Sequence, residues 1–587
     1  MTHMSQKTMI LGKDAPLEET ITRLKKKLLD LGFDVEEASW LNPVPNVWSV
    51  HIRDRFCPFL FTNGKGLTKD AALASALGEF FERLNCNYFF ADYHLGEKIS
   101  QSEFVHYPNE KWFQFDGDKM PEGMMNEDLW EWFDPAKELT PAQLVDTNSG
   151  NAQRGICALP YTNVITNKTY YIPMNIVGNL YVSNGMSAGN TKTEARVQAL
   201  SEVFERSVKN QILSEGIALP VIPQEVLKRY PKVMEAIAEL EANGYPIICK
   251  DASLGGKFPV INVTLLNPTE GTAFASFGAH PKFEVALERT LTELLQGRRL
   301  DELNVFSPPS FELEDVKDNL NLEAHFIDSN GLIHWNFFKE TSDYEFSDWS
   351  FGENTTQGEY DALIEIFKMI EKDVYVMDFE HLDVYGCRIH VPGMSEIYLP
   401  EDLAWDNNNA GYDVRAHILG AHELKAEDLM ELYTKLEDKG FDDMLLVAHA
   451  IGIIPDVGTY WGQLRMGEFK TMLALAAKNY EFAKSGTDWC LHFAPLEKDR
   501  KLLYLALNTL LQIEMDDTLN EKDFLGTVEK IYGKDLVEKA QKMINGFEKF
   551  DGLHESDMNH LGFEMHQKLI MSYEKLQVAK KLWASKK

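Results

Sequence analysis

The sequence predicts an α+β protein with a strand-and-helix part followed by an all-helical part. Three times, apolar strand-like runs and turn residues come before a helix with a polar stripe, so we expect pseudo-repeated strand-then-helix units. From about residue 412 the apolar spacing becomes helical and stays so to the C-terminus. A chain of 587 residues has room for several domains. We therefore expect a core at 1–405 and a helical domain at 412–587.

The first unit begins with a helix and ends with a second one. Apolar residues spaced three and four apart predict a helix from about Leu17 to Leu31. Val47–Asp54 and Cys57–Gly66 are mixed β-like and turn-rich sequence, with Asn-Gly as a turn signal. A helix is expected from about Thr68 to Phe90.

The second unit repeats this order. Tyr170–Asn184 is strand-like, and the GMSAGN stretch that follows is expected to be a flexible turn. A helix is then expected from about Thr191 to Glu215.

The third unit contains two expected strands, Phe258–Asn267 and Thr272–His280. Pro281 is expected to open a helix that runs to about Arg299, because proline is favoured at a first helical position. Residues 302–358 are acidic and aromatic and contain Pro and Asn, which predicts a loop-rich insertion. A further strand-rich piece, Asp383–Gly393, closes the core.

The C-terminal part is expected to consist of successive helices over residues 425–585. The segment GQLRMGEFKTMLALAAKNYEFAKSGTDWCLHF pairs two helices across a short turn, and small and large apolar residues alternate in it. This pattern is loosely tetratricopeptide-like. A plain helical bundle is the alternative.

Composition excludes several classes of function. The net charge is −33, which disfavours general binding of nucleic acid or of anionic membrane, because such a chain repels phosphates. The six Cys lie far apart without a C-x-x-C, which excludes a local zinc ribbon or iron–sulfur motif. The first residues lack an apolar signal-peptide core, and no apolar run reaches the length of a membrane span. We therefore expect a cytoplasmic protein.

The three helices carry rows of polar residues among Ala, Leu, Phe and Val. Offsets of three, four and seven residues keep the members of a row on one helical face. The rows are Ser75, Glu79 and Glu82 in the first helix; Glu194, Gln198, Glu202 and Glu205 with Arg206 beside them in the second; and Arg289, Glu293 and Gln296 in the third.

Two interpretations of these rows are open. Each row can be a solvated face with Glu–Arg pairs, and Glu194 also completes a TKTE capping box. If the helices converge, the carboxylates instead meet in one pocket and require cations. Mg²⁺ takes oxygen ligands and leaves positions for phosphates, while arginines neutralise phosphate charge. The repetition after similar strand-and-turn contexts favours a nucleotide–Mg²⁺ site.

The common phosphate-binding loop is absent, because no G-x-x-x-x-G-K-[ST] occurs. SNGMSAGNT, at Ser183–Thr191, places glycines and small residues before a helix N-terminus, where backbone N–H groups can meet phosphate. The nucleotide site would therefore be of another type.

At these residues the sequence resembles the YcaO family, and most closely its stand-alone bacterial branch. The resemblance rests on SALGEFFER, SNGMSAGNTKTEARVQALSEVFER and ASFGAHPKFEVALERTLTELLQGR, and it runs over nearly the whole chain. It implies a YcaO-type core that binds ATP and Mg²⁺. The magnesium-side carboxylates implied are Glu79, Glu82, Glu202, Glu205 and Glu293. The ATP-binding residues implied are Lys13, Thr20, Ser75, Asn190, Glu194, Gln198, Arg206 and Arg289, with threonine at position 20 where serine is familiar.

The resemblance implies two functions. The family activates peptide backbone amides by ATP-dependent phosphorylation of the amide oxygen, as in cyclodehydratases. The stand-alone branch is associated with potentiating β-methylthiolation of a small-subunit ribosomal protein, as an accessory factor to the methylthiotransferase. This chain ends KKLWASKK without the proline-rich tail of many azoline-forming members, which argues against azoline formation.

The accessory role, with latent ATP hydrolysis, is the first hypothesis, and backbone-amide activation is the second. A third is a helical adaptor in which the carboxylate rows are only ion pairs. The expected partners are ATP and a protein or peptide substrate, or else the methylthiotransferase and its ribosomal protein. We expect neither nucleic acid nor membrane as a partner, and we expect a homodimer.

Overall fold

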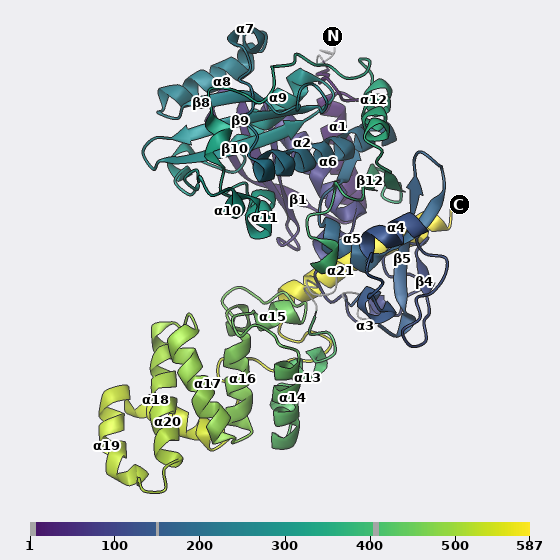
Figure 1. Ribbon diagram of the computed structural model, residues 1–587. Helices are drawn as coiled ribbons and strands as arrows, with labels where there is room; N and C mark the ends of the chain where they lie inside the picture. Colours follow the sequence, from purple (N-terminus) through teal and green to yellow (C-terminus); the bar gives the residue numbers. More distant parts are fainter. Residues whose placement is uncertain (1–6, 148–151, 403–409, 587) are drawn as a thin grey trace, which may run out of the picture.

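The computed structural model describes residues 7–147, 152–402 and 410–586. It confirms an α+β protein with a helical C-terminal part, and all named strand pairs in this described part are antiparallel. In Figure 1 the sheets and their helices form the upper body, and the C-terminal helices form a lower body.

The strands form three sheets within the described residues. In spatial order, the first is β1 (Val35–Val44), β2 (Val47–Asp54) and β3 (Phe61–Gly66); the second is β10 (Thr272–Ala279), β9 (Val260–Asn267) and β8 (Ile247–Asp251); and the third is β4 (Lys111–Phe113), β5 (Ile156–Asn163), β11 (Tyr375–Phe379), β12 (Tyr385–His390) and β7 (Met186–Gly189), with β6 (Thr169–Pro173) also paired to β5.

The helices of the strand-and-helix part are α1 (Leu17–Asp30), α2 (Lys69–Asn85), α3 (Glu97–Ser100), α4 (Glu127–Phe133), α5 (Met174–Tyr181), α6 (Lys192–Glu215), α7 (Gln224–Leu227), α8 (Pro231–Ala242), α9 (Phe283–Leu294), α10 (Leu313–Lys317), α11 (Asn319–Ile327) and α12 (Thr356–Met369). Those of the C-terminal part are α13 (Arg415–Leu419), α14 (Ala426–Asp438), α15 (Val447–Ala450), α16 (Met466–Ala476), α17 (Tyr480–Phe493), α18 (Lys498–Glu514), α19 (Glu521–Tyr532), α20 (Lys534–Ile544) and α21 (Glu564–Ala584).

Three of these helices carry the polar rows, and local sequence fixes their ends. The hydroxyl of Thr68 caps α2 by accepting from the N–H of Ala71, and that of Thr191 caps α6 by accepting from the N–H of Glu194. Gly216 ends α6 in the left-handed conformation, as glycine does at many helix C-termini.

Three local expectations are wrong. Tyr170–Asn184 holds the short strand β6 followed by the helix α5, and GMSAGN contains the strand β7. Short apolar runs do not separate buried helix from buried strand, which explains the first error. Pro281 precedes α9, which begins at Phe283. The loop-rich segment 302–358 also contains the short helices α10 and α11.

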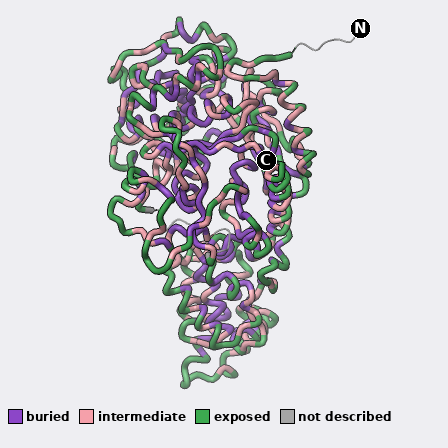
Figure 2. Tube along the Cα trace, turned by 90° about the vertical axis from the view of Figure 1, so that its right-hand side faces the viewer, coloured by how far each residue is buried: buried purple, intermediate pink, exposed green. Residues whose placement is uncertain are grey.

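The last helix, α21, returns from the C-terminal part to the strand-and-helix part and appears in yellow, running toward the C-terminus at the right of Figure 1. Leu569, Tyr573 and Leu576 belong to the same buried cluster as residues of α1 and α2. Lys580 is fully buried, and its ammonium donates to Asn87 Oδ1 at 2.6 Å and to the carbonyl of His106 at 2.8 Å. Buried segments run through both bodies in Figure 2, with exposed residues along the outer edges.

Candidate functional site

The helix α6 is the centre of the candidate site. Its polar row runs from Glu194 to Glu205, which spans about 17 Å at the rise of an α-helix. Its first turn packs near the N-terminal segment, and its later turns lie near α2 and α9. The residues expected from the sequence therefore fall into three levels along one helix.

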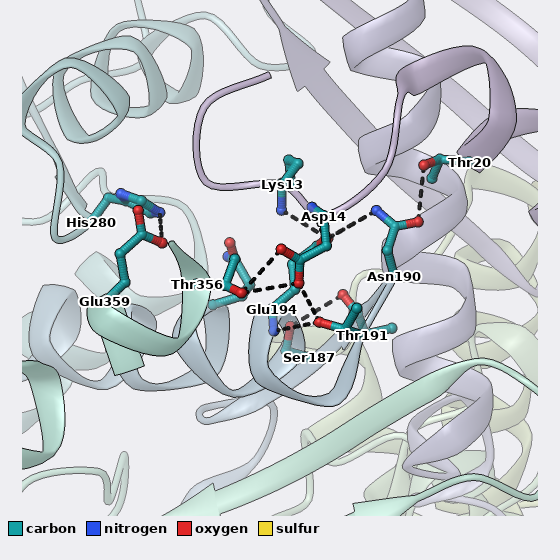
Figure 3. Close-up of polar contacts among 12 residues, drawn as sticks. Lys13, Asp14, Thr20, Ser187, Asn190, Thr191, Glu194, His280, Thr356 and Glu359 are labelled. Atoms are coloured by element: carbon teal, nitrogen blue, oxygen red, sulfur yellow. Dashed lines mark hydrogen bonds and ion pairs between the residues drawn. The ribbon is translucent and has the colours of Figure 1, made fainter. Parts of the chain in front are cut away.

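The first level gathers residues that are far apart in the chain (Figure 3). The ammonium of Lys13 lies 3.5 Å from Glu194 Oε1, and Glu194 is buried. The hydroxyl of Thr20 donates to Asn190 Oδ1 at 2.9 Å, and the Nδ2 of Asn190 donates to both oxygens of Glu194 at 3.2 and 3.1 Å. The structure thus brings together four of the predicted ATP-binding residues. The positive charge of Lys13 and the hydrogen bonds from Asp14 and Asn190 outweigh burial and hold the pKa of Glu194 below its usual range.

Asp14 and its hydroxyl partners at this level were not predicted. The carboxylate of Asp14 accepts from the hydroxyl of Thr191 and, at 3.0 Å, from the hydroxyl of Thr356 at the start of α12. Its backbone N–H donates to Glu194 Oε2 at 2.9 Å. Asp14 directly follows Lys13, which the family resemblance implied as a site residue, so the sequence carried a local signal for it. No sequence signal points to Thr356, which comes from more than 300 residues away.

The loop before Lys13 needs a glycine. Gly12 has φ +75°, and a Cβ at this position would lie 2.8 Å from His280 Nε2. His280 and Glu359 are both buried beside this loop, with His280 Nε2 3.9 Å from Glu359 Oε2 (Figure 3). A side chain at Gly12 would therefore displace the segment that carries Lys13.

The second level joins α6 to α9. Arg289 donates from Nη1 to Gln198 Oε1 at 2.5 Å, so these two predicted residues meet. Ser75 lies on α2, one turn before Glu79, and is exposed; its hydroxyl makes no hydrogen bond to any residue in the described ranges. It is therefore not joined to the other predicted ATP-binding residues by direct contact.

The third level holds the predicted magnesium-side carboxylates, each beside a cation or a backbone donor. Glu79 Oε1 accepts from Arg83 at 3.2 Å, and Glu82 lies 3.5 Å from the same guanidinium. The remaining contacts are Glu202 Oε1 with Arg206 Nη2 at 2.6 Å, Glu205 Oε2 with the N–H of Ala279 at 3.3 Å, and Glu293 with the ammonium of Lys65.

The pKa shifts show that these groups act on one another. Burial raises the pKa of Glu82 well above its usual range; Arg83 opposes this rise, while Glu202 and Glu79 add to it. Burial lowers the pKa of Lys65 to about 8, with Glu205, Glu79 and Glu202 opposing the fall. The carboxylates of α2 and α6 therefore share one electrostatic environment with Lys65 and Arg289. Lys65 lies in the turn-rich segment Cys57–Gly66 and was not predicted as a site residue.

The donor set at this level suits Mg²⁺ and phosphate. No three His, Cys, Asp or Glu side chains within residues 7–147, 152–402 and 410–586 already surround a point that could hold a metal. The carboxylates are hard oxygen donors, which Mg²⁺ prefers. Arg83 Nη1 and Arg206 Nε are buried and have no hydrogen-bond partner in those same residues. Buried donors without acceptors are costly, and phosphate oxygens would satisfy them.

Within the described residues, no helix is both long enough and apolar enough to cross a membrane. All six cysteines are free and buried, and burial raises the pKa of Cys86 and Cys249 to about 12, which keeps both thiols protonated. Thiolate chemistry at Cys86, beside the carboxylates, is therefore disfavoured.

Comparisons with known proteins cover almost the whole chain. Residues 63–395 match the family model described as YcaO cyclodehydratase, ATP- and Mg²⁺-binding, and residues 411–582 match the model described as YcaO cyclodehydratase C-terminal domain. The chain is 54% identical over 583 residues to the "Ribosomal protein S12 methylthiotransferase accessory factor YcaO" of Escherichia coli, covering 98% of this chain and 99% of that protein. It is also 54% identical over 586 residues to an uncharacterized protein of Haemophilus influenzae, with the same coverage.

Among solved structures, YcaO from Methanopyrus kandleri bound with AMPPCP and Mg²⁺ is 19% identical, with a TM-score of 0.40 over 67% of this chain and 95% of that one. A TM-score of 0.40 is too low to support a shared activity. The assignment rests instead on the family models and the full-length relatives. A family model that spans 63–395, and 54% identity along 98% of the sequence, show that this chain belongs to the YcaO family.

Proposed function

We propose that this chain binds ATP with Mg²⁺ along α6 and acts as an accessory factor to a ribosomal protein S12 methylthiotransferase. The observation that carries the accessory role is the end-to-end 54% identity with the Escherichia coli protein of that name. The family model over residues 63–395 carries ATP and Mg²⁺ in its description. The three levels of polar residues along α6 support this position for the nucleotide.

In this proposal the nucleoside lies at the first level and the phosphates lie at the third. Lys13, Thr20, Asn190 and Glu194 already contact one another there, and Ser75 and Gln198 would complete the pocket. Arg206 and Arg289 would donate to phosphate oxygens. The five carboxylates Glu79, Glu82, Glu202, Glu205 and Glu293 would hold Mg²⁺.

Bound Mg²⁺ would neutralise phosphate charge and stabilise the additional charge that develops in phosphoryl transfer. The part played by this chain's own residues is positional. Gln198 holds the guanidinium of Arg289 by a 2.5 Å hydrogen bond, and Glu202 holds that of Arg206 at 2.6 Å. Both arginines are therefore held in place on or beside α6 before any phosphate arrives, which lowers the entropic cost of binding.

A second candidate is an ATP-dependent enzyme that activates a backbone amide of a peptide. The specific observation in its favour is the word cyclodehydratase in both matching family descriptions. The two candidates share the nucleotide site and differ in whether ATP is consumed in proportion to a modified peptide.

Calorimetric titration of ATP with Mg²⁺ tests the shared site. We expect wild-type protein to bind, and Glu79→Gln and Arg289→Ala each to weaken binding at least about tenfold, which corresponds to 1.4 kcal/mol. Glu241→Ala is the matched control, because Glu241 is exposed on α8, away from the polar rows. If the wild-type protein binds no ATP, the carboxylate rows are structural ion pairs and not a nucleotide site.

ADP release separates the two candidates. An accessory factor should release ADP slowly alone and raise the yield of methylthiolated ribosomal protein S12 when the methylthiotransferase is present. A backbone-amide enzyme should release one ADP for each modified peptide bond, with a mass change in the peptide.

We further propose a domain division at 1–405 and 412–587, a cytoplasmic location and a homodimer. The proposed ribosomal partner supports the location. Sedimentation equilibrium tests the homodimer: a dimer would sediment at twice 67.0 kDa. A single species at 67.0 kDa over micromolar concentrations would contradict it.

A further inference from the structure

A large cavity adjoins the third level of the site. Its volume is about 920 Å³, and its wall combines segments of the strand-and-helix part with segments of the helical part. Cys86 and Tyr88 enter it just beyond the C-terminal end of α2, Ser207 and Asn210 enter it from α6, and Ala450 enters it from α15. Binding cavities for ligands usually measure about 300–1,000 Å³, so this one is large enough for a sizeable ligand.

Two arginines separate the cavity from the carboxylates. The guanidinium of Arg83 lies 4.5 Å from the centre of the Tyr88 ring, and that of Arg206 lies 4.4 Å from the centre of the Phe326 ring. Both rings line the cavity. Along α2 and α6 alike, the carboxylates come first, the arginine next, and the cavity residues last. A molecule in the cavity would therefore meet the rings of Tyr88 and Phe326, with the guanidiniums of Arg83 and Arg206 behind them.

The wall of the cavity is rich in carboxamides. It contains Asn210 and Asn319, three further asparagines that already hydrogen-bond to the protein (Asn87, Asn175 and Asn179), and aromatic side chains such as Tyr93 and Trp132. A carboxamide both donates and accepts a hydrogen bond, as a peptide bond does. Ser207 and Asn210 make no side-chain hydrogen bond to residues of the three described ranges, although both are only partly exposed. These two groups are open for an incoming ligand.

We propose that this cavity binds an extended segment of polypeptide from the protein partner, with its backbone amides on Ser207 and Asn210 and one end against the rings of Tyr88 and Phe326. This inference rests on the proposed function, because it places the partner at the phosphate end of the nucleotide site. The net charge of −33 disfavours a nucleic acid as the occupant. The helical part contributes to the wall, so the rest of the partner can lie across its surface.

The first experiment locates the partner by thiol protection. Ser207→Cys is nearly isosteric, and the six natural cysteines are buried, so the new thiol should be the main target of a maleimide. We expect ribosomal protein S12, added with Mg²⁺ and ATP, to slow labelling at position 207 at least about fivefold. Asn243→Cys, in an exposed position at the end of α8, should label at an unchanged rate.

The second experiment blocks the cavity. Asn210→Trp should weaken binding of ribosomal protein S12 at least about tenfold, measured by fluorescence anisotropy, while Asn243→Trp leaves it unchanged. Calorimetric affinity for ATP with Mg²⁺ should stay within twofold in both variants, which shows that they fold.

The outcomes distinguish this inference from the proposed function. Unchanged labelling at position 207, full binding by Asn210→Trp, or no binding of ribosomal protein S12 by a wild-type chain that binds ATP would each overturn the cavity as the partner site. A wild-type chain that binds no ATP would overturn the proposed nucleotide site instead. If only a small molecule or RNA, and not ribosomal protein S12, slows labelling at position 207, the cavity binds another ligand and the polypeptide proposal is wrong.

Discussion

Charged groups cluster in both parts of the molecule, but in opposite ways. In the C-terminal part a single buried carboxylate, Glu468 of α16, is surrounded by donors. Its Oε1 accepts from the hydroxyls of Tyr460 and Tyr504 at 2.7 and 2.8 Å and from Arg500 Nε at 2.9 Å. Its Oε2 also accepts from Tyr460, at 2.7 Å. Both oxygens are therefore used.

In the strand-and-helix part, the carboxylates outnumber the cations around them. Five carboxylates of α2, α6 and α9 lie among fewer cations, and most of these carboxylates have one close partner rather than several, as with Glu79 and Arg83 at 3.2 Å. Burial raises the pKa of Glu82, and the like charges of Glu202 and Glu79 add to this rise. A carboxylate whose two oxygens both accept from donors, like Glu468, belongs to a structural network, whereas carboxylates with one donor each, like Glu79, keep oxygens available for a cation.

The largest expected effect breaks the structural network. Glu468→Ala removes the acceptor of two tyrosine hydroxyls and of Arg500, and it leaves the buried guanidinium with Asp551 alone. We expect unfolding of the C-terminal part to need about 3–5 kcal/mol less, because Arg500 loses one of its two carboxylate partners and two tyrosine hydroxyls lose their acceptor. Urea unfolding followed by circular dichroism measures this change.

Glu481→Ala is the matched control, because Glu481 is exposed on the neighbouring helix α17. A loss below about 1 kcal/mol for Glu468→Ala, similar to that of the control, would remove the distinction between the two regions.

Much of the polar site could be predicted because its residues lie on helices at regular spacings. Offsets of three, four and seven residues fix which side chains share a face, so the rows on α2, α6 and α9 were visible without a structure. The fold class was equally accessible, since helix and strand periodicities differ. The identities of Lys13 and Thr20 as site residues came from the family resemblance alone.

The remainder depended on contacts between distant segments. Thr356 reaches Asp14 only because α12 packs beside α6, and no local pattern records that packing. The packing of α21 into the core could not be predicted either, because Tyr573 and Lys580 also fit the pattern of a surface helix. Likewise, the sequence predicts a strand where α5 lies, because its short apolar run fits either form.

A smaller, pH-dependent effect tests whether the histidines at the junction of the two parts are buried in the neutral form. His94 Nδ1 lies 3.0 Å from His560 Nε2. The ring of His566 packs against the ring of His560, with centroids 4.5 Å apart, and His566 Nε2 lies 2.9 Å from the carbonyl oxygen of His94. Burial lowers the pKa values of His94, His566 and His560 to about 2, 3 and 4, with Arg415 also opposing protonation. Asp557 alone partly offsets this at His560.

These folded-state pKa values lie below the ordinary histidine value of 6.5, so the unfolded chain binds more protons below pH 6.5. The free energy of unfolding should therefore fall as pH drops from 6.5 toward 4, by up to about 1.4 kcal/mol per pH unit for each histidine. His560→Gln should reduce this slope, as measured by urea unfolding at pH 7, 6 and 5. His417→Gln, exposed on α13, should keep the wild-type slope, and an unchanged slope in His560→Gln would contradict the prediction.

The smallest expected effect is the change in stability when Glu79, a carboxylate of the candidate cation site, is replaced. Glu79 is part-exposed, and its charge raises the pKa of Glu82. Glu79→Gln keeps a carbonyl that accepts from Arg83 and removes one like charge, so the ligand-free protein should keep its stability within about 0.5 kcal/mol. The same substitution should weaken binding of ATP with Mg²⁺ at least about tenfold. Thermal unfolding with and without the nucleotide measures both, since only the wild type should gain stability from the ligand. A Glu79→Gln protein that loses stability without ligand, yet gains as much from ATP as the wild type, would show that Glu79 belongs with Glu468 as a structural carboxylate.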